Sequence, residues 1–265
     1  MHRPSLPEDL DHPEQVWARA ATLAVVAAAM NDGDEYSWGP DGLHCWNCGG
    51  SYWWRLKLYD DGRALLCGQD SDGSYTHNGD KQIDFLAGGP AWLPWEQLRD
   101  DAQGNLLGFA YWYEDGAWSR APYPAALPDD GLEMAMSWAA PGDAAVQEIT
   151  EHLVALLETD VRPAATVRAF IASAAARTVG AADVSALLDA VCGPDCWYEV
   201  RPEAAWAFAV ELGLTAGDRG GCRRRRRRRA AGAAAEPRRA SGPSAPVPPA
   251  QGEEALGERI GVAGG

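Results

Sequence analysis

The chain has few of the features that point directly to a class of protein. With 6 Cys among its 265 residues, it lacks the cysteine density of a disulfide scaffold. Its longest apolar run, from Ala20 to Met30, is too short to cross a bilayer. The residues before that run are acidic, whereas a secretory signal begins with positive charge. The sequence therefore favours a cytoplasmic protein with reduced thiols over a secreted or membrane-spanning one.

Recognisable enzyme motifs are also missing from the sequence. It contains no nucleophile elbow, no P-loop and no glycine motif for dinucleotide binding. Its 5 His are scattered along the chain, and none lies in a setting that activates a nucleophile. The sequence thus indicates no reaction and favours a non-enzymatic role, although catalytic groups that meet only in the folded chain leave no such motif.

Charge divides the chain into two unequal parts. Residues 1–216 hold 33 acidic against 12 basic residues, a charge of about −21, and residues 217–265 hold 5 against 11, a charge of about +6. An acidic body repels nucleic acid and anionic membranes through its summed field. We therefore expect a basic protein partner for the body, no membrane association and no cofactor. The 46% hydrophobic content, with 12 Trp, is ample for a packed core.

The first half of the chain combines one helix with alternating strands. Pro13 and the acids beside it predict a helix that runs to about Met30. The segment "YWWRLKLYD" alternates with a period of two, which is typical of a half-buried strand. The Asp-Asp-Gly turn at residues 60–62 joins it to "RALLCG" as a hairpin. The segment "NLLGFAYWYEDGAWSRAPY" predicts a second hairpin that turns at residues 114–116.

Between the hairpins the chain is irregular, with a short helix expected near residues 83–87 and one helical turn in "PAWLPWEQLRD". After Pro128 the apolar period becomes 3.6, which predicts helices over residues 131–214. The predicted buried stripes are Val146, Ile149, Leu153, Leu156 and Leu157; Val167, Phe170, Ile171 and Ala174; Val184, Leu187, Leu188 and Val191; and Trp206, Ala209, Val210 and Leu212.

These patterns predict an α+β fold in which an N-terminal helix packs on a four-stranded antiparallel sheet made of the two hairpins. A helical C-terminal bundle and a disordered tail follow. The expected divisions are 1–128 for helix and sheet, 129–216 for the bundle, and 217–265 for the tail. Sheet and bundle can pack as one domain.

The tail is dominated by Ala, Gly, Pro and Arg and has no aromatic residue, so it cannot bury enough apolar surface to offset its ordering entropy. The uninterrupted Arg223–Arg229 run is typical of an arm that neutralises phosphates of nucleic acid or lipid. Two alternatives are favoured over such an arm. The tail folds back on its own acidic body, or it arose from a shifted reading frame in GC-rich DNA.

Cysteines offer the alternative of a zinc-stabilised protein or a metal-dependent enzyme. Cys45 and Cys48 have the C-x-x-C spacing that lets two thiolates share one Zn²⁺. His44, or Cys67 on the returning strand, would supply a third ligand. A single C-x-x-C pair more often consists of ordinary buried or loop cysteines at the entrance to a sheet, and we favour that interpretation.

Two further polar clusters have plain structural interpretations. Glu148 and His152 are one helical turn apart, as metal ligands in bundles are, but the polar face of a surface helix explains them. The acids near residues 70–80 lack the spaced ligands and terminal Glu of an EF-hand, so we interpret them as a turn.

Aromatic residues are the remaining candidates for function, because the sheet has more of them than one buried face needs. Aromatic side chains dominate binding hot spots, and the hairpin turns would surround them with carboxylates. The alternative is that the helices cover these rings as core. The predicted patch consists of Trp53, Tyr59, Asp60, Asp61, Trp112, Tyr113, Glu114, Asp115 and Trp118.

The segments "WWRLKLYDDGRALLCGQD" and "LLGFAYWYEDGAWSRAPY" resemble a loosely known group of acidic, Trp-rich bacterial proteins from GC-rich genomes, over residues 13–125. That group has no assigned activity. The resemblance implies a cytoplasmic protein and carries no functional residues over to this chain. The C-x-x-C pair is not part of the shared pattern.

Overall fold

The computed structural model of the chain describes residues 1–30, 35–47, 49–157, 163–192 and 199–216. All of these belong to one unit of the chain, Met1–Arg223. They form seven α-helices, two short 3-10 helices and eight strands. The α+β class predicted from the sequence is therefore confirmed.

The helices lie mainly at the beginning and in the second half of the chain. They are η1 (Pro7–Asp9), α1 (Pro13–Ala29), α2 (Trp95–Gln103), α3 (Leu132–Met136), η2 (Ser137–Ala139), α4 (Asp143–Leu157), α5 (Ala164–Ala176), α6 (Ala181–Cys192) and α7 (Pro202–Glu211).

The strands form one large antiparallel sheet in the order β1-β2-β3-β4-β7-β8, and β5 pairs with β6 in a small separate ribbon. Their bounds are β1 (Tyr36–Gly39), β2 (Gly42–Trp46), β3 (Tyr52–Leu58), β4 (Ala64–Asp70), β5 (His77–Asn78), β6 (Lys81–Gln82), β7 (Phe109–Glu114) and β8 (Ala117–Arg120).

The predicted sheet of four strands is wrong in number, because the described chain builds six. Both predicted hairpins form, β3–β4 and β7–β8, although the second begins at Phe109 and is shorter than expected. Strands β1 and β2 arise from a Gly- and Asp-rich segment that looked like a loop. Gly42 permits their close approach to β3, since a Cβ there would lie 2.3 Å from the carbonyl oxygen of Leu56.

Other local predictions also needed correction. Residues 83–87 form no helix, since 83–84 are irregular and a turn follows over residues 85–88. The expected single helical turn in "PAWLPWEQLRD" is the nine-residue helix α2. In α7 the predicted stripe is rotated: Ala205 and Ala209 are buried, whereas Val210 is exposed. The stripes of α5 and α6 are buried as predicted.

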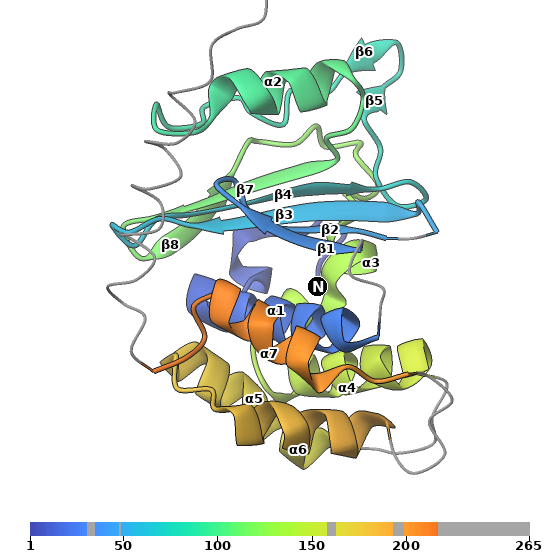
Figure 1. Ribbon diagram of the computed structural model, residues 1–265. Coiled ribbons are helices and arrows are strands. Elements are labelled where there is room, and N and C mark those ends of the chain that lie inside the picture. Colours follow the sequence, from blue (N-terminus) through green and yellow to red (C-terminus); the bar gives the residue numbers. More distant parts are fainter. Residues whose placement is uncertain (31–34, 48, 158–162, 193–198, 217–265) are drawn as a thin grey trace, which may run out of the picture. The chain divides into compact units, whose positions relative to one another are not determined.

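The sheet lies between two unequal layers (Figure 1). Helices α1 and α3 lie against one face, which we call the helical face, and α4–α7 pack beyond α1. Helix α2 and the irregular chain near it cover the other face, the α2 face. Alternation along β3 divides Trp54 and Leu56 on the helical face from Trp53 and Arg55 on the α2 face. Each face has its own hydrophobic core.

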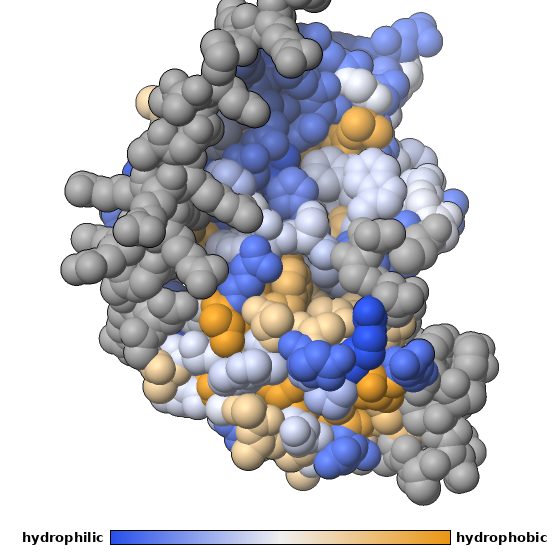
Figure 2. Space-filling model, viewed as in Figure 1, coloured by the Kyte–Doolittle hydropathy of each residue, from blue (hydrophilic) through white to orange (hydrophobic). Residues whose placement is uncertain are grey.

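Helix α1 occupies the middle of the helical layer. Its side chains are apolar or small nearly all round, which is typical of a fully buried helix. It contacts β3 on one side and α4, α5 and α7 on the other. Among the described residues, no helix has both the length and the apolar character that crossing a membrane requires. Figure 2 shows a mostly hydrophilic surface around α2 and a mixed surface over the helices.

Candidate functional site

Two hairpin turns meet at one end of the sheet. Strands β3 and β7 both pair antiparallel with β4 and so run in the same direction. The turns that follow them therefore lie side by side. Asp115 and Gly116 have φ angles of 54° and 87°, as the tight turn between β7 and β8 requires. We call this end, with Asp60, Asp61, Glu114 and Asp115, the acidic end.

A pocket of about 440 Å³, the turn pocket, lies between the two turns. One guanidinium enters it: Arg63 pairs with Asp61 at 2.5 Å and lies 4.7 Å from the ring centre of Trp92. Its hydrogen bond to Asp61 lowers the pKa of that carboxyl. Within the described part of the chain, Asp60, Glu114 and Asp115 form no hydrogen bond or ion pair through their side chains. The pocket is lined by Asp61, Gly62, Arg63, Glu114, Asp115 and Gly116.

A second pocket of about 430 Å³, the strap pocket, adjoins the first, because Gly116 borders both. Its walls are mainly apolar and aromatic. The Tyr113 ring meets those of His12 and Trp118 edge to face, each with centres 5.4 Å apart. The lining residues are Pro7, Glu8, Leu10, His12, Tyr113, Gly116, Ala117 and Trp118.

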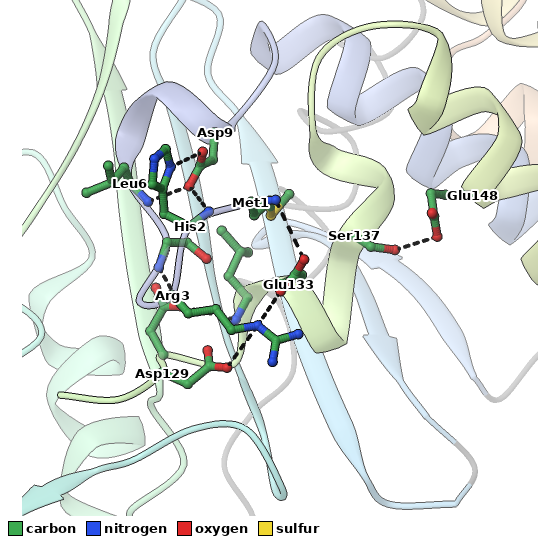
Figure 3. Close-up of polar contacts among 12 residues, drawn as sticks. Met1, His2, Arg3, Leu6, Asp9, Asp129, Glu133, Ser137 and Glu148 are labelled. Atoms are coloured by element: carbon green, nitrogen blue, oxygen red, sulfur yellow. Dashed lines mark hydrogen bonds and ion pairs between the residues drawn. The ribbon is translucent and has the colours of Figure 1, made fainter.

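One wall of the strap pocket is the N-terminal strap, Met1–Leu10, which runs beside β8. Figure 3 shows the start of this strap beside α3. The Arg3 side chain reaches Glu133 at 2.5 Å and Asp129 at 3.7 Å, while His2 turns back to Asp9. Arg3 is largely exposed, so these contacts hold the strap only weakly.

A buried network fixes the strap more firmly at Ser5. The Ser5 amide donates to Asp130 Oδ1 at 3.2 Å, and its carbonyl accepts from Tyr111 Oη at 2.9 Å and from Arg120 Nε at 3.0 Å. Tyr111 Oη also lies 2.7 Å from Asp130 Oδ2. Asp130 and Ser5 are fully buried. Burial raises the pKa of Asp130 and that of Tyr111.

The strap is fixed again just beyond the pocket, at Asp11. Trp118 Nε1 donates to the Asp11 carbonyl at 2.7 Å, and the Asp11 amide donates to Ala139 O at 3.0 Å. The buried Arg19 binds the Asp11 carboxylate at 2.5 Å. The wall residues Pro7, Glu8 and Leu10 thus lie between two fixed points of the backbone.

The structure divides the predicted aromatic patch between the two faces of the sheet. Trp53, Tyr59 and Trp112 belong to the α2 face, and Tyr113 and Trp118 to the helical face. The tryptophans are mostly buried, with 7–9% of their surface exposed. The aromatic residues therefore form no single surface. Tyr113 and Trp118 are the ones that border a pocket beside the predicted acids.

The predicted zinc ligands are likewise divided. Cys45 pairs with Trp54 on the helical face, where it lies 4.0 Å from Glu35 Oε1. Cys67 lies on the α2 face and accepts from Arg55 Nη2 at 3.4 Å, so Cys45 and Cys67 cannot bind one ion. Burial raises the pKa of Cys67, which keeps it a thiol.

His44 shares the α2 face with Cys67, but Arg55 lies between them, because Arg55 on β3 is paired with His44 on β2 and with Cys67 on β4. Burial and the nearby Arg55 lower the pKa of His44. Cys48 lies outside the described residues, as does the Arg223–Arg229 run. Among the residues that the structure describes, no group of three His, Cys, Asp or Glu side chains is placed to hold a metal ion.

The two further polar clusters lie apart from the acidic end. Glu148 accepts a hydrogen bond from Ser137 at 3.0 Å (Figure 3), and burial lowers the pKa of His152. Asp70 accepts from the amides of Asp72 and Gly73, as a turn requires.

Sequence reasoning missed the strap entirely. It gave Glu8, His12 and Asp130 no role in a site. The only local signal for the strap was its short Pro- and acid-containing composition, which does not indicate where it docks. Comparisons with protein families, curated proteins and solved structures found no match to this chain.

Proposed function

We propose that this is a non-catalytic binding protein whose acidic end takes up a cationic segment of a partner protein. The observation that carries the proposal is the group of carboxylates at the two turns, of which Glu114 and Asp115 line the turn pocket. Asp60, Glu114 and Asp115 form no hydrogen bond or ion pair within the described chain, whereas Asp61 already holds Arg63. Such carboxylates are available to form ion pairs with an incoming Lys or Arg.

Backbone geometry supports a preformed site. The two turns are fixed by strand pairing, and Tyr59 N bonds to Arg63 O at 2.9 Å across the first of them. A partner would not have to order these loops, so less of the binding energy is lost. The charge of about −21 over residues 1–216 would also steer a cationic partner toward the body.

The proposal is tested by neutralising the acidic end without changing its shape. The variant Asp60→Asn, Glu114→Gln, Asp115→Asn removes three charges, and Asn tolerates the positive φ of residue 115. The matched control, Asp189→Asn, Glu203→Gln, Glu211→Gln, removes three exposed charges from α6 and α7. An oligo-lysine peptide serves as the probe, and calorimetry at low and high salt gives its affinity.

We expect the acidic-end variant to bind the peptide about tenfold more weakly than the control variant, since each exposed ion pair contributes up to about 1 kcal/mol. The binding should also lose part of its salt dependence. Equal losses in the two variants would show that net charge alone attracts the peptide, and the acidic end would then have no special role.

A further inference from the structure

The strap pocket has a chemistry different from that of the turn pocket beside it. The turn pocket is polar and already contains a guanidinium, whereas none of the described residues lining the strap pocket is Lys or Arg. Its only carboxylate is Glu8, and its other walls are Pro7, Leu10, Ala117 and the rings of three residues. We propose that this pocket binds an N-methylated ammonium group, the side chain of a trimethyllysine in the cationic segment. The inference rests on the proposed function.

The lining favours a methylated over an unmethylated ammonium. A lysine ammonium carries three N–H donors that lose water on entry and need acceptors. Among the described lining residues Glu8 is the one carboxylate acceptor, and it is exposed to solvent. A trimethylammonium group has no donor to satisfy and spreads its charge over its methyl groups. It therefore gains from apolar contact and from the charge of nearby carboxylates at the same time.

Three aromatic side chains, His12, Tyr113 and Trp118, border the pocket. The His12 and Tyr113 planes meet at 74°, and those of Tyr113 and Trp118 at 68°. The rings thus pack edge to face on one another and form one continuous aromatic part of the wall. Faces of aromatic rings attract cations through the ring quadrupole, and cages of such rings recognise quaternary ammonium groups.

The pocket is held open by contacts outside it. Asp130, Tyr111 and Arg120 fix the strap at Ser5, and Trp118 fixes it at Asp11. The Trp118 ring is oriented by the same hydrogen bond that anchors the strap. A ligand would meet a preformed wall, so binding would not have to order the strap.

Three small probes separate the possible sources of affinity. Choline carries a quaternary ammonium, ethanolamine carries an unmethylated one, and neohexyl alcohol is the uncharged carbon analogue of choline. Titrations of the full chain are followed by Trp fluorescence and by calorimetry. We expect choline to bind about tenfold more tightly than either analogue, in keeping with desolvated cation–π interactions of about 1–2 kcal/mol.

Two variants locate the binding. Tyr113→Leu keeps an apolar side chain but removes the lining ring that contacts both His12 and Trp118, and Tyr75→Leu removes an exposed ring from the chain after β4. We expect Tyr113→Leu to weaken choline binding about tenfold and Tyr75→Leu to leave it unchanged. Glu8→Gln, an exposed change, should weaken choline binding without affecting neohexyl alcohol. Unchanged binding in both pocket variants would overturn the assignment.

Equal affinity for choline and neohexyl alcohol would show that the pocket binds any apolar group of this size, which would overturn the inference. Failure of choline to bind would overturn it as well. Lysine and trimethyllysine versions of one basic peptide link the site to the proposed partner, and we expect the methylated peptide to bind more tightly. If the lysine peptide binds at the acidic end without any preference for methylation, this inference fails and the proposed function stands. If the protein binds phosphatidylcholine vesicles but shows no preference between the lysine and trimethyllysine peptides, the ligand of the pocket is a lipid headgroup and the assignment to a protein partner is refuted.

Discussion

The two faces of the sheet are packed by different means. The centre of the helical face is filled by large apolar side chains such as Trp17 and Trp54, under helices whose apolar stripes match it. The α2 face is covered by one nine-residue helix and irregular chain, and it holds the buried Arg55 in the middle of β3. Each layer also holds a buried arginine, but Arg19 belongs to the covering helix α1, whereas Arg55 is a charged anchor in the sheet itself.

The largest effect is expected from emptying the centre of the helical face. Trp54→Ala should lower the free energy of unfolding by about 3–5 kcal/mol, because helices on one side and strands on the other limit collapse of the cavity. Trp112→Ala, on the α2 face, should cost about 1 kcal/mol less, since irregular chain can close around the gap. Urea denaturation measures both. Equal costs would mean that the α2 face is as tightly packed as the helical face.

The charged anchor of the α2 face provides the second test. Arg55 binds Asp101 Oδ2 at 2.9 Å, and its side chain is 4% exposed. Asp101→Ala should lower the free energy of unfolding by about 3 kcal/mol, because it leaves the Arg55 charge buried and without its carboxylate. The double variant Arg55→Met, Asp101→Ala should recover most of this loss. If the double variant is less stable than the single one, the guanidinium supports the face through contacts other than the ion pair.

The margin of the helical face, where the strap docks, contains polar groups as well. Tyr111→Phe should lower the free energy of unfolding by about 1 kcal/mol, the value of a lost buried hydrogen bond. It should also speed hydrogen exchange at the strap amides near Ser5 more than at those of α5. Tyr52→Phe, a change at the other end of the sheet, should leave exchange in the strap unaltered. Uniform exchange changes would show that Tyr111 does not fix the strap.

The smallest effect concerns how the free energy of unfolding depends on pH through Asp130, which lies where the strap docks. Burial raises the pKa of Asp130 above its usual value, so the folded protein keeps this proton when the unfolded chain, with a pKa of about 3.9, has released it. The proton held by Asp130 stabilises the fold in full at pH values below the unfolded pKa. This stabilisation is lost as the pH rises through the pKa of Asp130 in the folded protein. Relative to Asp130→Asn, the natural protein should thus lose stability over this interval. Asp72→Asn, at an exposed position, should not change the slope; the opposite slope for Asp130→Asn would mean that its hydrogen bonds favour the charged form.

Strand β3 shows what could be predicted from sequence. Its strict alternation separates Trp54 and Leu56 from Trp53 and Arg55, and that division is the one observed. The predicted half-buried strand is wrong, however, because the α2 layer buries the second row as well. The β1–β2 pair was missed because its short strands have no clear alternation and depend on the free edge of β3. The acids of the candidate site were predicted from turn chemistry, which is local. Glu8 and His12 joined it only through the docking of the strap.

The sequence by itself determined the α+β class, the positions of both hairpins and the concentration of carboxylates at their turns, because period and turn chemistry act between near neighbours in the chain. Only the tertiary structure decided that Cys45 and Cys67 face opposite ways, that both rows of tryptophans are covered, and that the strap closes a pocket beside Trp118. The cysteines are separated by the register of neighbouring strands. The strap depends on contacts between residues more than 100 positions apart, such as Ser5 with Asp130. No local pattern encodes such a pairing, since its energy appears only when the whole core has formed.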